Sequence, residues 1–185
     1  PDKAVIRAYK YRGYGQYKRI SPYQNPSELI ELTNLVRDKE PKTVVEIGTH
    51  RGGTLYVWTQ ALPTANKFIS IDLPGGDFGG GYSEGRAQFY KSFTDKDLTC
   101  IRQNSHHEET KQKLKENLQG HSIDFLFIDA DHTYEGVQED YEMYKDLVSK
   151  NGVIAFHDIV PNETAPAIDV DTYWEELQEN HTTKE

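Results

Sequence analysis

Acidic and imidazole side chains follow two apolar runs in the second half of the chain, at positions where strands would end. They are Asp129, Asp131, His132, His157 and Asp158. Carboxylate oxygens with one or two imidazoles suit a divalent ion such as Mg²⁺ or Mn²⁺. Such an ion would hold a substrate hydroxyl and lower its pKa. Alternatively, His132 or His157 takes the proton as a general base, because imidazole titrates near neutral pH. A plainer role for Asp131 is to cap the helix that begins near residue 134.

A glycine-rich turn follows the first predicted strand. Residues 43–47 are β-branched apart from Glu46, which favours a buried parallel strand. Gly48, Gly52 and Gly53 then allow a sharp turn and the close approach of a ligand. The spacing lacks both the G-x-G-x-x-G of dinucleotide folds and the lysine of a P-loop. Since the missing features bind phosphate, we expect a nucleotide-type ligand without phosphate.

Strands and helices alternate along the whole chain. We expect strands at 43–47, 67–73, 98–104, 123–128 and 153–159, and helices from 26, at 53–62, 86–93, 108–118, 135–148 and 170–180. This order predicts an α/β, Rossmann-like, doubly wound fold with a mostly parallel sheet and helices on both faces. Ligands of such sheets bind beyond the carboxyl ends of the strands. Asp72, at the end of the second strand, is placed to bind the two hydroxyls of a ribose.

The composition limits the partners of the protein. The net charge of -9 over 185 residues argues against nucleic acid or an anionic membrane as the main partner. Cys100 is the single cysteine, which excludes an internal disulfide and favours a reducing compartment. No apolar run reaches membrane-spanning length and no signal-peptide pattern is visible, so we expect a cytoplasmic protein.

Two regions are expected, an N-terminal arm (1–25) and a ligand-binding domain (26–185). Tyrosines alternate with basic residues in the arm, a composition that can stack nucleic-acid bases. Given the acidic chain, we favour an arm that packs on the domain, covers the pocket or meets another subunit in a homo-oligomer. The glycine-rich segment 74–82 is expected to act as a lid beside the pocket.

Three linked motifs resemble one family. The segment 46–52 resembles motif I (E-x-G-x-x-x-G) of class I S-adenosylmethionine (SAM) methyltransferases. The segments 72–82, 127–140 and 151–158 resemble the bacterial group of that class with cephalosporin-hydroxylase-like and macrolide-sugar O-methyltransferase proteins. The resemblance covers about residues 26 to 180.

This resemblance implies a role for individual residues. Glu46, Gly48, Thr49 and Gly52 would shape the SAM pocket, Asp72 would bind the ribose, and Ser105 would border the adenine, with Asp129 beside the cofactor. Metal-dependent relatives use a carboxylate at the position of Asp129 and a ligand pair at those of His157 and Asp158. This chain differs, because that pair is usually two carboxylates or a carboxylate and an amide. The two further strands of the family sheet, an antiparallel C-terminal hairpin, are also expected to be missing, since residues 159–185 predict loop and helix.

The sequence thus predicts a SAM-dependent O-methyltransferase that acts on a hydroxyl of a small molecule or sugar, with a divalent metal as an optional cofactor. Two alternatives stay open. One is a metal-dependent hydrolase or hydroxylase-like enzyme that uses the Asp/His residues with water. The other is a SAM-binding module without catalytic activity. A requirement for SAM would separate the methyltransferase from the hydrolase or hydroxylase-like enzyme. Catalytic turnover would separate it from the SAM-binding module.

Overall fold

The centre of the protein is a five-stranded sheet with the strand order β3-β2-β1-β4-β5. The computed structural model describes residues 1–75, 81–161, 165 and 167–184. The strands are β1 (Thr43–Ile47), β2 (Lys67–Asp72), β3 (Asp97–Arg102), β4 (Ile123–Ile128) and β5 (Val148–Phe156). All four pairings are parallel. The chain starts in the middle and builds outward in two directions, as the doubly wound prediction requires.

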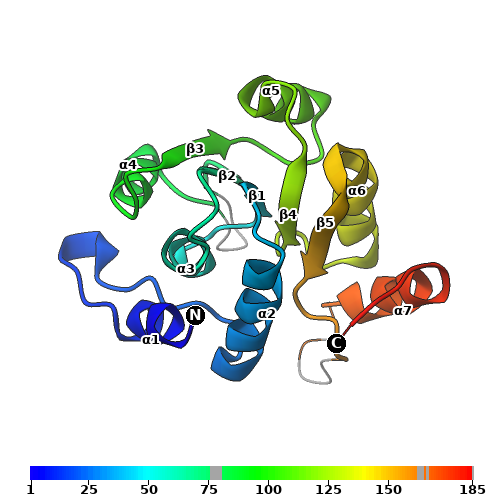
Figure 1. Cartoon of the computed structure of the whole chain (residues 1–185), viewed down its shortest axis with the longest axis horizontal. Coiled ribbons are helices and arrows are strands. Elements are labelled where there is room, and N and C mark those ends of the chain that lie inside the picture. The colour runs from blue at the N-terminus through cyan, green and yellow to red at the C-terminus, as the bar shows by residue number, and fades with distance from the viewer. Residues whose placement is uncertain (76–80, 162–164, 166, 185) are drawn as a thin grey trace.

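Helices cover both faces of this sheet (Figure 1). They are α1 (Asp2–Lys10), α2 (Pro26–Asp38), α3 (Gly53–Ala61), α4 (Glu84–Lys91), α5 (Glu108–Leu118), α6 (Tyr134–Tyr144) and α7 (Val170–Asn180). The first four pack on one face, where Trp58 lies edge-on to Phe125 and Phe127. The last three pack on the other face over Val45, Ile69 and their neighbours. Burial on both faces explains why the central strands read as continuous apolar runs.

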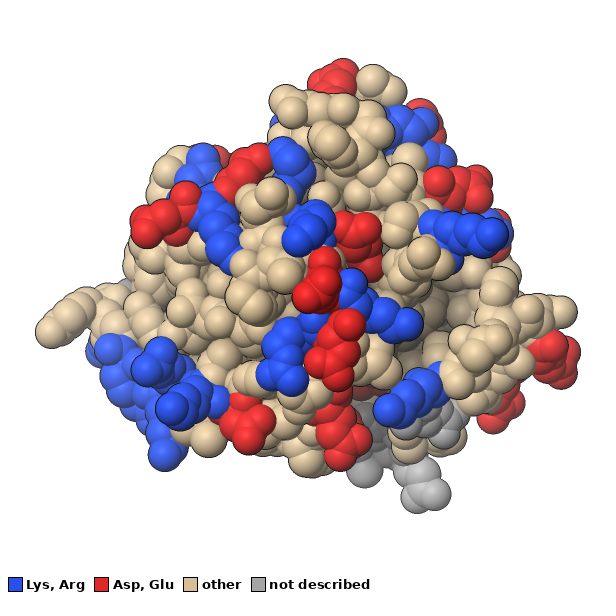
Figure 2. Space-filling model, in the orientation of Figure 1, with Lys and Arg blue, Asp and Glu red and all other residues tan. Residues whose placement is uncertain are grey.

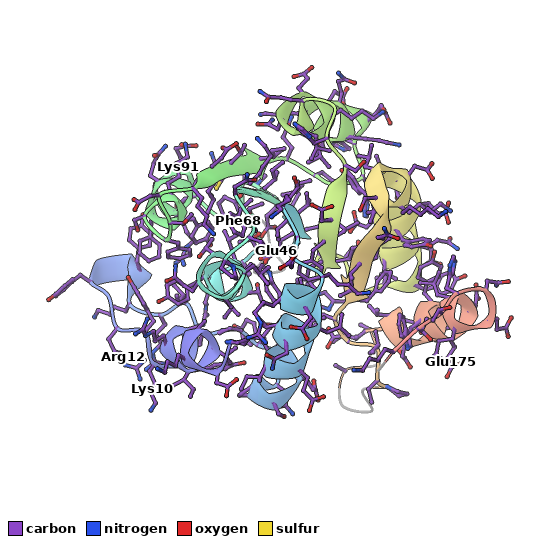
Figure 3. The ribbon with its side chains drawn as sticks, viewed as in Figure 1. Lys10, Arg12, Glu46, Phe68, Lys91 and Glu175 are labelled. Atoms are coloured by element: carbon purple, nitrogen blue, oxygen red, sulfur yellow. The ribbon has the colours of Figure 1, made fainter. Side chains whose placement is uncertain are left out.

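The N-terminal arm contains a helix, α1, that is not predicted from the sequence. The helix α1 packs against α3 and buries Ala4, Val5 and Ala8, two of which are alanines with little apolar surface. Beyond α1, Ile20 is fully buried, and Tyr17 stacks on Phe89 of α4 with ring centroids 4.9 Å apart. The arm therefore packs on the domain. Its basic side chains stay on the surface, where Figure 2 shows them gathered and Figure 3 labels Lys10 and Arg12.

Several boundaries differ from the predicted ones. The strand β5 begins five residues before the predicted start, because Val148 already pairs with Ile123 across a register shift. The helix α6 ends at Tyr144, and a short 3-10 turn (Lys145–Leu147) replaces its predicted last turn. The helix α4 starts two residues early, since Ser83 caps it by accepting from the Arg86 amide. The strand β3 ends at Arg102, two residues before the predicted end.

The C-terminal part agrees with the expected lack of a hairpin as far as it is described. After β5 the described residues form one helix, α7, and add no strand to the sheet. The strand β5 is therefore an edge strand, and residues 152–156 stay only half-buried. The predicted lid at 74–82 falls largely on residues 76–80, which lie outside the described residues. In the part of the chain that is described, no helix combines the length and apolarity needed to cross a membrane.

Candidate functional site

The carboxyl ends of the four strands β2, β1, β4 and β5 meet at one rim of the sheet. Backbone hydrogen bonds continue the ladder past the strand ends: the amides of Gly48, Asp129 and His157 donate to the carbonyls of Ile71, Ile47 and Ile128 at 2.9, 2.8 and 3.1 Å. These bonds fix the positions of the polar residues that follow each strand. The predicted convergence of strand tips is present.

Four of the five predicted rim residues form one cluster, in which Asp129, His132, His157 and Asp158 each offer a ligand atom within 4.8 Å of the others. The His157 Nδ1 atom lies 3.2 Å from Asp129 Oδ1 and 3.1 Å from Asp158 Oδ2. The His132 Nδ1 atom lies 2.6 Å from Asp158 Oδ2. Two imidazoles thus alternate with two carboxylates.

Asp131 lies outside this cluster. Its Oδ1 atom accepts hydrogen bonds from the amide and the hydroxyl of Thr133, at 3.0 and 2.8 Å. Thr133 is the N-cap of α6, and its own hydroxyl accepts from the Gly136 amide. Asp131 therefore supports the start of the helix, which is the plainer of the two roles that the sequence leaves open.

The pKa values of the cluster reflect its alternating charges. Burial alone would lower the pKa of His157, but the neighbouring Asp129 and Asp158 outweigh it and raise this pKa to about 10. The contact with Asp158 also raises the pKa of His132. Burial would raise the pKa of Asp158, yet the two imidazoles hold it well below its usual range. At neutral pH and without a bound cation, His157 therefore carries its proton and is an imidazolium ion beside Asp158.

Asp158 adopts an unusual backbone conformation, with φ of 58° in the left-handed region. Aspartate tolerates this region better than most residues because its short polar side chain can bond locally. The turn directs the Asp158 carboxylate back toward both imidazoles. Backbone strain of this kind gathers at functional sites.

The glycine turn after β1 is packed closely against other parts of the chain. A Cβ atom on Gly48 would lie 1.9 Å from the Asp129 carbonyl oxygen, and the residue has φ of 86°. A Cβ on Gly52 would meet the Tyr90 ring, and one on Gly53 would meet the Ile20 carbonyl of the arm. These glycines permit close approach of the chain to itself, and Gly48 couples the turn directly to the rim cluster.

Glu46 is fully buried in the strand β1, and Figure 3 labels it in the interior near α3. The Trp58 indole donates to Glu46 Oε2 at 2.6 Å and the Thr54 hydroxyl donates to Oε1 at 3.0 Å. Burial raises the pKa of Glu46 to about 8, against these two hydrogen bonds, which lower it. The sequence predicts the buried strand but not the two partners on α3.

Exchange of Glu46 for glutamine should flatten the pH dependence of stability. A carboxyl group whose pKa rises from 4.5 to about 8 on folding stabilises the fold fully below pH 4.5, and this stabilisation is lost as the pH rises through 8. The loss amounts to about 5 kcal/mol at 1.36 kcal/mol per pKa unit. Urea unfolding between pH 5 and 8 should show a steeper decline for the wild type than for Glu46→Gln. The exposed Glu109→Gln is the control; equal slopes for all three proteins would contradict a neutral buried Glu46.

Asp72 lies at the tip of β2, as predicted, but most of its carboxylate is already bonded to the chain. Its Oδ2 atom accepts from the amides of Thr49 and His50 at 2.9 and 2.7 Å, and Oδ1 accepts from the Leu73 amide at 2.8 Å. A carboxylate has about four acceptor positions, so one remains on Oδ1. Burial raises the pKa of Asp72.

Ser105 lies in the loop that leads from the end of β3 to α5. It is buried, and its carbonyl accepts from the Tyr144 hydroxyl of α6 at 2.6 Å. Because Arg102 at the end of β3 pairs with Asp72 at the end of β2, this loop leaves the sheet at the same edge as the Asp72 tip. The predicted position of Ser105 next to the carboxyl ends of the strands is therefore present.

One site residue was missed by sequence reasoning. Gln24, the last but one residue of the arm, donates from Nε2 to Asp129 Oδ2 at 2.6 Å. Only 8% of Gln24 is exposed. No pattern in residues 1–25 singles it out, because its position depends on how the arm packs across α3.

Comparison with known proteins identifies the family. Residues 45–159 match the model of a methyltransferase domain. The chain is 32% identical over 145 residues to an uncharacterized protein of Acanthamoeba polyphaga mimivirus, covering 74% of this chain and 61% of that protein. It is 28% identical over 131 residues to the protein described as probable caffeoyl-CoA O-methyltransferase 3 of Dictyostelium discoideum, covering 70% and 48%. The chain thus spans less than two thirds of either relative.

The fold agrees with a solved methyltransferase structure. The O-methyltransferase from Bacillus cereus in complex with SAH superposes with a TM-score of 0.62 at 16% identity, over 97% of this chain and 79% of that one. The family match covers the strands β1 to β5 almost completely and reaches past the rim cluster to residue 159. Because it spans more than half of the chain, this protein belongs to the methyltransferase domain family.

Proposed function

We propose that the protein is a SAM-dependent methyltransferase that methylates a hydroxyl group of a small molecule or sugar. The observation that carries the proposal is the meeting of the glycine turn, the Asp72 tip and the rim cluster at the carboxyl edge of one parallel sheet. Membership of the methyltransferase domain family supports the reaction class. The solved structure from Bacillus cereus contains SAH, the product that remains after SAM has transferred its methyl group.

The residues around the turn fit a nucleoside ligand. One acceptor position of the Asp72 carboxylate remains for a ribose hydroxyl, and the carboxylate itself is fixed by three backbone amides. The Thr49 hydroxyl bonds the Ser70 hydroxyl of β2 at 2.6 Å, and Glu46 accepts from the Thr54 hydroxyl of α3 at 3.0 Å, so these two residues fix the strand and the helix that flank the turn. We place the adenine beside Ser105, and the sulfonium end toward Asp129, which follows the neighbouring strand.

The rim cluster fits a divalent cation by its donor set. Two carboxylates and two imidazoles converge, and among the described residues the buried Nδ1 atom of His157 has no partner in hydrogen-bond geometry. We propose Asp129, His157 and Asp158 as ligands, and the structure adds His132 as a fourth candidate. A bound cation would polarise the acceptor hydroxyl and favour its deprotonated form.

The chain's own contribution to methyl transfer is positioning and proton handling. Transfer forms a bond between the acceptor oxygen and the methyl carbon as the bond from that carbon to sulfur breaks, and the hydroxyl proton must leave. Correct alignment of the reacting atoms can contribute about 7 to 11 kcal/mol. Where no cation is bound, His132 and His157 are the proposed proton acceptors instead, and His157, whose pKa is raised to about 10, can act only after it has lost its proton.

We propose a small-molecule acceptor rather than nucleic acid, because the chain carries a net charge of -9. The single cysteine supports a reducing compartment such as the cytoplasm. The arm (1–25) and the domain (26–185) remain our division of the chain, with the arm packed on the domain. A contact of the arm with a second copy of the chain in a homo-oligomer is part of the same proposal.

Titration calorimetry with SAH tests the cofactor pocket. We expect micromolar binding by the wild type and a loss of at least tenfold in affinity for Asp72→Ala, because the ribose loses its acceptor and the turn loses its two hydrogen bonds from the Thr49 and His50 amides. Asp97→Ala is the matched control, since Asp97 starts β3 at the opposite edge of the sheet. Failure of the folded wild type to bind SAH would refute the proposal, and unchanged binding by Asp72→Ala would refute the role of Asp72.

A further inference from the structure

The arm places one amide against the rim cluster. The Gln24 Nε2 atom donates to Asp129 Oδ2 at 2.6 Å, while Asp129 Oδ1 lies 3.2 Å from His157 Nδ1. The assignment of the two amide atoms is fixed by chemistry, because Oε1 in this place would set one acceptor against another. One carboxylate oxygen of Asp129 thus faces the arm, and the other faces the imidazole.

The other atom of the same amide has no partner. Gln24 Oε1 is buried and accepts no hydrogen bond within the part of the chain that the structure describes. A buried carbonyl without a donor is unfavourable. In this orientation the amide leaves Oε1 without a donor among the described residues while Nε2 bonds Asp129. We infer that the contact with Asp129 determines how the amide is oriented.

The backbone around Gln24 is held independently of its side chain. The Tyr9 hydroxyl of α1 donates to the Gln24 carbonyl, and the Ser21 hydroxyl donates to the Tyr9 carbonyl at 3.3 Å. Ile20 is fully buried, and its carbonyl passes the start of α3 where Gly53 has no side chain. These contacts therefore hold the backbone of residues 20–24 in place whether or not the Gln24 side chain contacts Asp129.

We propose that Gln24 is a positioning residue, whose amide holds the Asp129 carboxylate in the orientation that faces His157. A carboxylate is planar, so a bond that fixes Oδ2 also fixes the direction of Oδ1. The arm thereby becomes part of the reaction site, through one hydrogen bond to a residue that itself faces the reactants. The functional meaning of this role rests on the proposed methyltransferase function.

The test replaces the amide without shortening the side chain. Gln24→Met removes both the donor and the unpartnered carbonyl, so we expect a melting temperature within about 2 °C of the wild type or above it. The imidazole ¹⁵N resonances of His157 should shift, because Asp129 is free to turn away. Histidine correlation spectra measure this without substrate or metal, and a His157→Asn variant assigns the signals.

Two further variants separate positioning from a structural role. Gln88→Met makes the same exchange at an exposed glutamine, whose Nε2 donates to Glu84 Oε1 at 3.0 Å, and should leave the His157 resonances unchanged. Tyr9→Phe loosens the backbone of Gln24 but keeps its amide, and should shift those resonances less than Gln24→Met. With an acceptor in hand, Gln24→Met should lower kcat about 10- to 100-fold, the usual effect of losing a partner of a site residue, at constant KM for SAM.

Each contrary result has a clear meaning. Unchanged His157 resonances in Gln24→Met would overturn the proposal, because Asp129 would then keep its orientation unaided. A melting temperature lowered by more than about 10 °C, with changes throughout the spectrum, would also overturn it and assign Gln24 to the packing of the arm. SAH binding by the wild type decides the proposed function separately, so the two failures are distinguishable.

Discussion

Alanine at Gly48 should abolish SAH binding and destabilise the whole rim. The new Cβ would lie 1.9 Å from the Asp129 carbonyl oxygen and 2.7 Å from the Ala130 amide nitrogen, and neither backbone atom can rotate away. The turn after β1 and the tip of β4 would have to separate, which breaks the ladder bond between Asp129 and Ile47. We expect a loss of about 3 kcal/mol or more in the free energy of unfolding, from overpacking and from the left-handed backbone together.

Gly120 provides the matched control for this experiment. It has φ of 84°, almost the value of Gly48, but a Cβ there would meet no atom of the described residues within 4 Å. Gly120→Ala should therefore cost only the conformational part, about 1 kcal/mol, and keep SAH binding intact. Urea unfolding and SAH titration of both variants separate the effect of the steric clash from the effect of the left-handed backbone on stability and binding. Equal destabilisation of the two variants would show that the contact with Asp129 is not what requires glycine at position 48.

Most of the fold could be predicted from the sequence, because in the central elements the residues that start and end helices and the pattern of apolar residues indicate the same structure. The helix α2 begins at residue 26, as predicted, and the Asn25 side chain caps it by accepting from the Ser27 amide. The strands β1 and β2 are buried on both faces, so their apolar runs are continuous. The start of β5 was not readable, because residues 149–152 are polar and contain a turn signal, and their pairing with β4 is irregular.

The candidate site divides in the same way. Asp129, His157 and Asp158 could be predicted together because parallel strand tips share one rim, and the structure brings them within ligand distance. Gln24 could not, since its place follows from packing between the arm and α3 over more than 100 residues of sequence from Asp129. The partners of Glu46 depend likewise on which face α3 turns to the sheet. Contacts that follow from the order of the strands could be predicted. Contacts that depend on how the arm and α3 pack on the sheet could not.

The rim cluster should bind Mn²⁺ more tightly than Mg²⁺ by at least about tenfold. Mg²⁺ prefers oxygen ligands and keeps several waters, whereas imidazole nitrogens suit transition metals. Two of the four donors here are imidazoles, those of His132 and His157. His157→Asn should lower the affinity for Mn²⁺ and narrow the ratio between the two ions. Titration calorimetry with both ions measures this ratio.

The control and the proton count make this prediction specific. His106→Asn removes an imidazole that also lies between two carboxylates, 3.4 Å from both Glu139 and Asp140, but outside the cluster, so it should leave both affinities unchanged. Because the pKa of His157 is raised to about 10, its imidazole holds a proton at pH 7, and a cation that coordinates this nitrogen must displace that proton. Titrations at pH 7 in buffers of different ionisation enthalpy should then report about one proton more released per Mn²⁺ by the wild type than by His157→Asn. Release of no protons would place the ion on the carboxylates alone, and absence of binding would leave the four residues as an ion-paired cluster in which His132 or His157 handles the proton without a metal.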